Sequence, residues 1–124
     1  MNLIDALWSR RSIRRYQSRP VPRDLARSLI EAAQTAPSAG NLSARRYVLV
    51  NNEDMKRLLA AAAYGQEHIG AAPLLVVVCA DVRASGLRYG DRGSLFAIQD
   101  ADAATMCLLL AAHDAGLGAC WNGA

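Results

Sequence analysis

The apolar residues of this chain recur at intervals of three and four in several segments, and two short apolar runs lie between those segments. Intervals of three and four predict amphipathic helices, whereas short β-branched runs predict strands. The first predicted helix extends from Asn2 to about Arg11, because an Asn side chain can cap the first turn. Its apolar face is formed by Leu3, Ile4, Leu7 and Trp8.

Two more helices are predicted ahead of residue 65, each with a residue suited to its beginning. Pro22 fits the first helical position, and Pro37 ends that helix because proline cannot continue the hydrogen-bond pattern. Asn52 can cap the following helix. The predicted inward faces are Leu25, Leu29, Ile30 and Ala33 in the first of these helices and Met55, Leu58, Leu59 and Ala62 in the second.

The two apolar runs, residues 47–50 and 74–80, are predicted strands. The second run is apolar on both faces, which predicts a central strand covered by helices on each side. A short helical turn is expected between the runs, bracketed by Gly65 and Gly70. This alternation of helices and buried strands indicates a layered α/β or α+β domain.

The last third of the chain begins with a polar, glycine-containing stretch, residues 81–94, which predicts a surface loop. A long helix is predicted from about Ser94 to Ala115, roughly 30 Å at 1.5 Å per residue, with Gly116 as its C-cap. The middle of this helix, residues 103–112, is apolar nearly all round. A monomer of 124 residues has little room to bury such a helix on every side, so we expect self-association.

The length of 124 residues corresponds to a single domain, residues 1–124. The net charge of +3 conceals an asymmetry, because residues 1–46 have a balance of +6 and residues 47–124 a balance of −3. Such local positive charge favours one anionic ligand over a generally basic surface. Nucleic acid is not an expected partner, since no aromatic residues are interleaved with the arginines.

The cysteines and histidines exclude several classes of site. Cys79, Cys107 and Cys120 are odd in number and lack CxxC spacing, which argues against a disulfide framework or a zinc site and favours reduced thiols in a cytoplasmic protein. His68 and His113 are isolated, so no metal site is expected. The longest uncharged apolar run, residues 69–80, is shorter than the roughly 20 residues that span a bilayer, and no signal peptide or membrane contact is expected.

Three stretches combine residues that suit a flat, anionic ligand. Residues 10–16 include four arginines and a serine, and guanidinium groups match phosphate and polarised carbonyl groups. Residues 36–41 place small residues and an amide after a helix stop, so the backbone can approach a ring. Residues 116–124 are glycine-rich and expose backbone donors. Taken singly, each stretch also fits an ordinary role: a solvated charged turn, a helix stop, or a cap before a strand.

In this order, with a buried strand and helix between them, the three stretches resemble the nitroreductase family of FMN-dependent oxidoreductases along nearly the whole chain. The resemblance implies an α+β three-layer sandwich with a central mixed or antiparallel sheet flanked by helices. It also implies an intertwined homodimer with FMN at the subunit interface. Arg10 and Ser12 would hold the phosphate and ribityl end, with Arg11 nearby, and Arg14 would stabilise the reduced flavin at its pyrimidine end.

The same resemblance assigns the second and third stretches to the flavin ring. A group from the other subunit would approach the ring: Pro37, Ser38, Ala39 and Asn41. Gly123 would direct a backbone amide at N5, and Gln66 would contact the pyrimidine edge. No side chain is expected to act as a catalytic acid or base, because the flavin supplies the chemistry. The implied reaction is ping-pong: NADH or NADPH reduces FMN, and a nitroaromatic or quinone-type acceptor takes the electrons.

The chain departs from the family pattern in two places. Ser43 and Ala44 stand where many members have Gln-Pro or a similar pair, which bears on substrate preference. The pattern also continues past Ala124 with a strand, further basic residues and a C-terminal arm, and without them weaker phosphate binding and a weaker dimer are expected. Two alternatives stay open: a flavin-binding module without turnover, and a nucleic-acid-binding protein whose affinity for polyanions falls steeply with salt.

Overall fold

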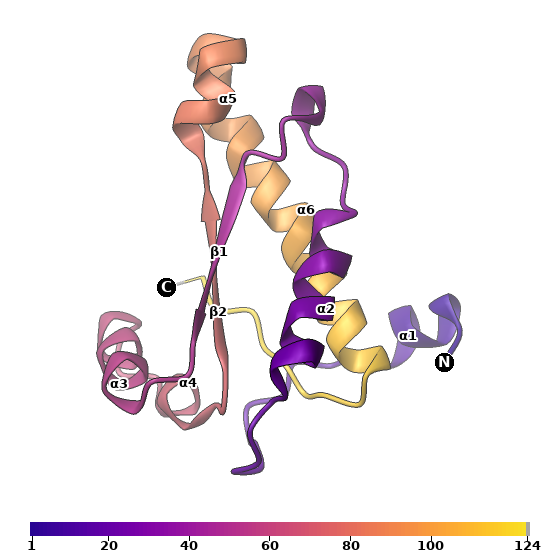
Figure 1. Ribbon diagram of the computed structural model, residues 1–124, viewed down its shortest axis with the longest axis vertical. Helices are drawn as coiled ribbons and strands as arrows, with labels where there is room; N and C mark the ends of the chain where they lie inside the picture. The colour runs from indigo at the N-terminus through magenta and orange to yellow at the C-terminus, as the bar shows by residue number, and fades with distance from the viewer. Residues whose placement is uncertain (124) are drawn as a thin grey trace.

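Helices alternate with two strands in the computed structural model, which describes residues 1–123 (Figure 1). In chain order the elements are α1 (Leu3–Ser9), α2 (Arg23–Gln34), the 3-10 helix η1 (Ala39–Asn41), β1 (Arg45–Val50), α3 (Glu53–Ala62), α4 (Glu67–Ala71), β2 (Leu75–Ala80), α5 (Val82–Tyr89), the 3-10 helix η2 (Gly90–Arg92) and α6 (Gly93–Asp114). Both predicted strands and the long last helix are therefore present.

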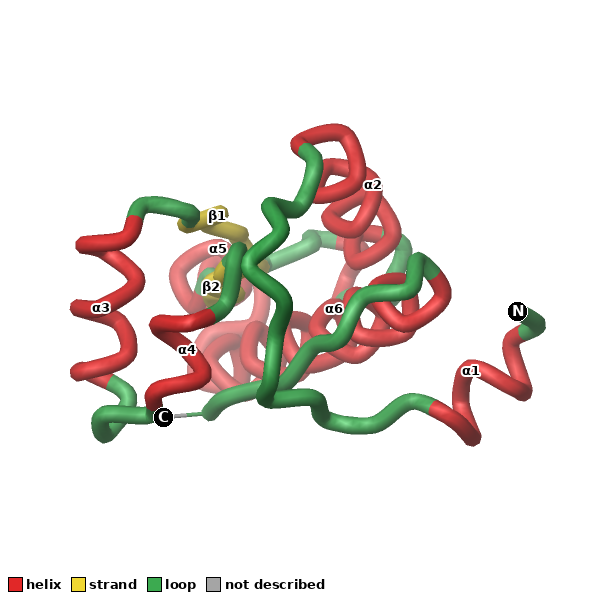
Figure 2. The backbone as a smooth tube through the Cα atoms, turned by 90° about the horizontal axis from the view of Figure 1, so that it is seen from below, coloured by secondary structure: helices red, strands yellow, loops and turns green. Residues whose placement is uncertain are grey.

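The two strands form an antiparallel pair in which Arg45 lies opposite Ala80 and Val50 opposite Leu75. Figure 2 shows the pair between the helices α3 and α4 on one side and α2 with α6 on the other. This arrangement confirms an α+β fold with an antiparallel sheet flanked by helices. The prediction that residues 74–80 form a central strand is wrong, because within residues 1–123 β2 pairs only with β1, and all its residues are half-buried.

The core lies where α2 and α6 pack against each other and against the strands, and it is built largely from alanine. Ala33 on α2 and Ala104 on α6 are fully buried, and Ala36 and Leu108 complete the buried cluster. The predicted inward face of α2 is confirmed, since Leu29 and Ala33 are buried. Small side chains at this contact let the two helices approach closely, so α6 forms the central support of the fold.

The local signals at helix ends are confirmed with small shifts in position. The side chains of Asn2 and Asn52 each accept a backbone hydrogen bond of 2.9 Å from the first turn of their helices. The first helix ends at Ser9, two residues before its predicted end. Pro22 is the N-cap of α2 rather than its first residue, and α2 ends at Gln34, ahead of Pro37.

Two predicted apolar faces are not buried. On α1, Trp8 is 78% exposed, and the rest of the predicted face is exposed with it: Leu3, Ile4 and Leu7. On α3 the predicted face is wrong, because Met55 and Leu58 are exposed and Lys56 is the buried residue. The reason is that α3 packs mainly on α4, where Lys56 Nζ donates to the Ala72 carbonyl oxygen at 2.8 Å.

Residues 81–94 form helices α5 and η2, so the predicted surface loop is wrong. Asp81 caps α5 by accepting a hydrogen bond of 3.0 Å from the Ala84 amide. Arg83 and Arg88 of α5 are exposed, whereas Ser85 is fully buried where α5 meets α6. Gly93 makes this close crossing possible, because a Cβ there would lie 2.8 Å from the Ser85 carbonyl carbon.

The long helix α6 begins one residue before the predicted start and ends next to the predicted end. By length and composition alone, the span Val82–Asp114 could cross a membrane. Gly90, with a φ of 58°, interrupts that span between α5 and α6. Because α6 also packs on α2, α5 and both strands, it is the core helix of this fold.

Candidate functional site

The first and third predicted stretches lie side by side. Ser12 and Ala119 form a parallel bridge, and the Ile13 amide donates to the Ala119 carbonyl oxygen at 2.9 Å. The chain returns to this point because Gly116, with a φ of 77°, reverses its direction after α6. Two residues distant in sequence thereby share one short sheet-like contact.

The reversal at the end of α6 is a complete Schellman motif. The Gly116 amide donates to the His113 carbonyl oxygen at 3.0 Å, and the Leu117 amide donates to the Ala112 carbonyl oxygen at 2.8 Å. These bonds satisfy carbonyl groups at the helix end and fix the direction in which the tail, residues 117–123, leaves α6. Gly116 therefore ends the helix one residue after the C-cap, which is Ala115 rather than the predicted Gly116, and it positions the third stretch.

Tight packing holds the two stretches together. A Cβ on Gly118 would lie 2.8 Å from Ile13 Cγ2, closer than side-chain carbons normally approach. Beside this contact is a cavity of about 140 Å³, whose polar lining residues are Ser9, Arg10, Arg11 and His113. Among residues 1–123, no carboxylate lines it. The local charge therefore favours an anion.

The arginines of the first stretch differ in their surroundings. Arg11 Nη1 donates to the Trp8 and Arg10 carbonyl oxygens, at 2.8 Å each, whereas Arg10 is half-buried at the cavity. Ser12 and Arg14 are exposed. Arg10 and Arg11 thus line the cavity, and Arg11 is exposed like the groups farther along the stretch.

Tyr16 lies where the first stretch meets the tail. Its hydroxyl donates to the Ile13 carbonyl oxygen at 2.6 Å. Burial raises the pKa of Tyr16, Cys120 raises it further, and Arg14 acts in the opposite direction. The pKa of Tyr16 is therefore influenced by one residue of the first stretch, Arg14, and by one residue of the third, Cys120.

The second predicted stretch is held by α6 and α5. The Ala39 amide donates to Asp100 Oδ1 at 3.0 Å, and Ser38 Oγ accepts a hydrogen bond of 2.9 Å from the Ser43 amide. Gly40 has a φ of 63°, and the hydroxyl of Tyr89 occupies the space that a Cβ there would need. Pro37 and Asn41 are exposed. The turn is therefore rigidly supported while part of it faces solvent.

Arg45 supports the second stretch from beneath. Its side chain is 1% exposed, and it donates to carbonyl oxygens of Ala36 at 2.6 Å, Pro37 at 3.0 Å and Asp100 at 2.8 Å. Its Nε also donates to Gln34 Oε1 at 3.1 Å. One guanidinium thereby joins the end of α2, the second stretch and α6.

The second stretch lies far from the other two within one chain. It contacts α6 at Asp100, whereas the cavity and tail contact α6 near His113. The two positions are about 20 Å apart along the helix at 1.5 Å per residue. Figure 1 shows the same separation: the turn before β1 and the helix α1 lie at opposite ends of α6.

Gln66 and Gly123 are brought to one side of the molecule. Gln66 is the N-cap residue of α4, and its Nε2 donates to the Ala63 carbonyl oxygen at 2.9 Å. His68 Nε2 lies 2.8 Å from Asn122 Oδ1, so α4 and the tail are in contact, as Figure 2 also shows. Gly123 is exposed, and Ala124, the last residue of the third stretch, lies outside the described residues.

Several residues that shape the site have no signal in the sequence. Arg45, Asp100 and His113 act through partners far along the chain, and each looks ordinary where it stands. Within the described part of the chain, no group of three or more His, Cys, Asp or Glu side chains is placed to hold a metal ion.

Comparison with known proteins identifies the family of this chain. Residues 7–68 and 60–124 match the model of the Nitroreductase family. The chain belongs to the nitroreductase family. A relative from Methanothermobacter thermautotrophicus, whose name combines NADH dehydrogenase and NAD(P)H nitroreductase, is 36% identical over 124 residues, 99% of this chain and 61% of that protein.

Two further relatives extend the comparison. An NADH dehydrogenase from Thermus thermophilus is 49% identical over 77 residues, 62% of this chain and 38% of that protein. The solved structure of an FMN-dependent nitroreductase from Clostridium difficile matches with a TM-score of 0.83 and 30% identity, covering 97% of this chain and 65% of that one. The aligned parts of this chain therefore cover between 38% and 65% of the length of these three relatives.

Proposed function

We propose that this chain forms the FMN-binding part of a cytoplasmic oxidoreductase. It transfers electrons from NADH or NADPH to a nitroaromatic or quinone-type acceptor by a ping-pong mechanism. The bridge between Ser12 and Ala119 is the observation that supports this most directly, because it joins two of the three stretches that the family resemblance assigns to the flavin. The names of the NAD(P)H and FMN-dependent relatives agree with it.

The residues at this bridge fit a phosphate-bearing, planar cofactor. The cavity of about 140 Å³ is lined by Arg10 and Arg11 and, among residues 1–123, by no carboxylate, which suits a phosphate group. Arg10 and Ser12 would hold the phosphate and ribityl end, with Arg11 beside them. A Cβ on Gly123 would meet nothing within 4 Å, so its backbone is open to a ring.

Bound FMN would supply the redox chemistry, accepting a hydride from the nicotinamide and passing electrons to the acceptor. The protein would bind and tune it. The Gly123 amide would donate toward N5, and Arg14 would stabilise the negative charge that builds up at the pyrimidine end on reduction. Gln66 uses its amide nitrogen on Ala63, which leaves its Oε1 as the group for the pyrimidine edge.

A second copy of this chain would complete the site. The second stretch cannot reach the cavity of its own chain across about 20 Å of α6, so Ser38 and Asn41 would serve the partner's flavin. The surface supports an interface, because the chain exposes 8261 Å², whereas a compact monomer of its mass exposes roughly 6,500 Å². The exposed apolar face of α1, with Trp8 at its end, is part of that excess.

The visible absorption spectrum tests the proposed function. The purified protein, supplied with FMN, is expected to show flavin bands that bleach when NADH or NADPH is added without oxygen. Flavin that binds but does not bleach would indicate a binding module without turnover. A protein that takes up no FMN would refute the proposal.

The role of Arg14 has its own test. Arg14→Ala should lower the flavin reduction potential by about 30 mV, which for two electrons corresponds to about 1.4 kcal/mol, and should slow reduction by NAD(P)H. Arg15→Ala is the matched control, because Arg15 is also exposed and has no proposed flavin contact. Equal potentials in parent, Arg14→Ala and Arg15→Ala would remove Arg14 from the site.

A further inference from the structure

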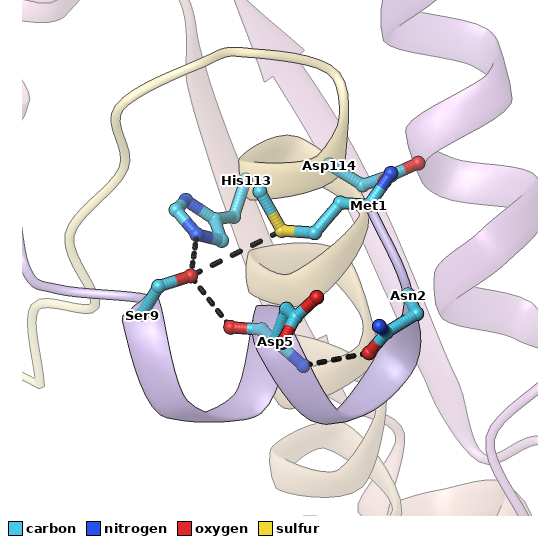
Figure 3. Close-up of polar contacts among 6 residues, drawn as sticks. All are labelled: Met1, Asn2, Asp5, Ser9, His113 and Asp114. Atoms are coloured by element: carbon cyan, nitrogen blue, oxygen red, sulfur yellow. Dashed lines mark hydrogen bonds and ion pairs between the residues drawn. The ribbon is translucent and has the colours of Figure 1, made fainter.

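The last turn of α6 and the end of α1 meet in a polar contact that involves none of the predicted site residues (Figure 3). Ser9 Oγ lies 2.6 Å from the Asp5 carbonyl oxygen and 2.7 Å from His113 Nε2. A hydroxyl has one proton, and a carbonyl oxygen can only accept. The Ser9 hydroxyl therefore donates to Asp5, and His113 Nε2 bears the proton that it donates to Ser9.

This contact fixes one end of the segment formed by residues 10–12. The other end is fixed by the 2.9 Å hydrogen bond from the Ile13 amide to the Ala119 carbonyl oxygen. Both anchors belong to the end of α6 or the tail that follows it. The arginines that line the cavity therefore lie between two fixed points on the same support.

The helix α1 cannot provide this support alone. It has seven residues, of which Ala6 is buried, and isolated helices of this length are unstable in water. A second polar tie to α6 is the pair between the Met1 amino group and Asp114 at 3.6 Å, and such exposed pairs contribute little. The Ser9–His113 hydrogen bond is thus the short, directional link that sets where α1 ends.

His113 also shares the cavity wall with both guanidiniums. Arg10, Arg11 and His113 line the same space of about 140 Å³. Arg10 is the C-cap residue of α1 and comes directly after Ser9. Any shift of Ser9 away from His113 would move the Arg10 backbone and its guanidinium with it.

We propose that His113 is a positioning residue for the phosphate end of the bound flavin, acting through Ser9 on Arg10 and Arg11. The inference rests on the proposed FMN function. His113 touches no reacting atom in this role; it holds the arginines in place before the ligand arrives. Preorganised groups lose less freedom on binding than mobile ones, and this difference appears as affinity for the phosphate.

The test compares two flavins that differ only in the phosphate. Affinities for FMN and riboflavin are measured by quenching of flavin fluorescence in the parent, His113→Leu, His113→Gln and Ser9→Ala. His113→Leu should weaken FMN binding about tenfold, as for loss of one hydrogen bond, and change riboflavin binding less than about twofold. His113→Gln should restore FMN affinity to within about threefold, because an amide nitrogen can replace Nε2 as donor.

Two further variants isolate the Ser9 contact. Ser9→Ala should reproduce the His113→Leu effect, and the double variant should be no weaker than either single one, since both remove the same bond. Asp114→Asn is the matched control: it weakens the neighbouring pair with Met1 and should leave the ratio of FMN to riboflavin affinity unchanged.

Equal weakening of FMN and riboflavin in His113→Leu would show that His113 only stabilises the fold, and would overturn the inference. Unchanged FMN affinity in Ser9→Ala would also overturn it, and this arm remains decisive if His113→Leu does not fold. A parent protein that binds neither flavin would instead refute the proposed function, and with it the role of His113.

Discussion

Replacing Arg45 tests how the buried guanidinium supports the second stretch. Arg45→Met keeps most of the side-chain volume but removes every donor. The carbonyl oxygens of Ala36, Pro37 and Asp100, now bonded at 2.6, 3.0 and 2.8 Å, would lose those bonds. A buried polar group left without its partner costs about 1–3 kcal/mol.

The expected loss of unfolding free energy is about 3–5 kcal/mol, because several acceptors lose one partner together and water can reach only some of them. Domains of this size are stable by about 5–15 kcal/mol in total. The midpoint of thermal unfolding should therefore fall by roughly 10–20 °C. Arg45→Lys keeps the charge and part of the bonding, so its loss should be about half as large.

Urea unfolding followed by circular dichroism measures both variants, with Arg46→Met as the matched control. Arg46 is the next residue, but its side chain is 64% exposed and its ionic partner is Asp81, so its loss should stay under about 1 kcal/mol. A loss below about 1 kcal/mol in Arg45→Met, or equal losses at both positions, would refute the assigned supporting role of Arg45.

Two other predictions concern the α5–α6 crossing and the pH dependence of stability. Gly93→Ala should lower the free energy of unfolding by about 1–3 kcal/mol, because its Cβ would lie 2.8 Å from the Ser85 carbonyl carbon. Gly86→Ala is the control, since its Cβ would meet nothing within 4 Å. Thermal unfolding should show that this variant is as stable as the parent or more stable. Burial raises the pKa of Tyr47, Arg45 lowers this pKa, and Cys107 raises it further. The neutral phenol therefore stabilises the fold below about pH 10, the pKa of an unfolded tyrosine. This stabilisation is lost as the pH rises through the folded-state pKa. Urea titrations should show a smaller loss of unfolding free energy between about pH 9 and pH 11 in Tyr47→Phe than in the parent. Equal losses in the two proteins would show that Tyr47 does not cause this pH dependence.

The features that the sequence predicted correctly depend on contacts between near neighbours. The caps at Asn2 and Asn52 bond to amides three residues ahead, and the reversal at Gly116 needs only the last turn of α6. The apolar stripe of α2 and the length of α6 likewise follow from residues within one helix. Such patterns are visible in the sequence because the partner is a few residues away.

The helix in residues 81–94 was missed because its stability depends on another element. Its sequence is polar and contains glycines, which is typical of a loop, yet Gly93 lets α5 pack closely on α6. The face of α3 was also predicted wrongly, because only the tertiary structure shows that α3 packs on α4 rather than the sheet. In both cases the helix that packs against the segment determined its secondary structure or its buried face, which the local sequence pattern did not.

For the candidate site, the sequence by itself determined which stretches suit an anionic, planar ligand. The tertiary structure decided how they are arranged: it joined residues 10–13 to Ala119 and separated both from the second stretch. It also formed supporting hydrogen bonds between residues far apart in the sequence. Arg45 and Asp100 are separated by 55 residues, and Ser9 and His113 by 104 residues. No local pattern marks such residues, because a hydrogen bond between distant segments exists only once the chain has folded.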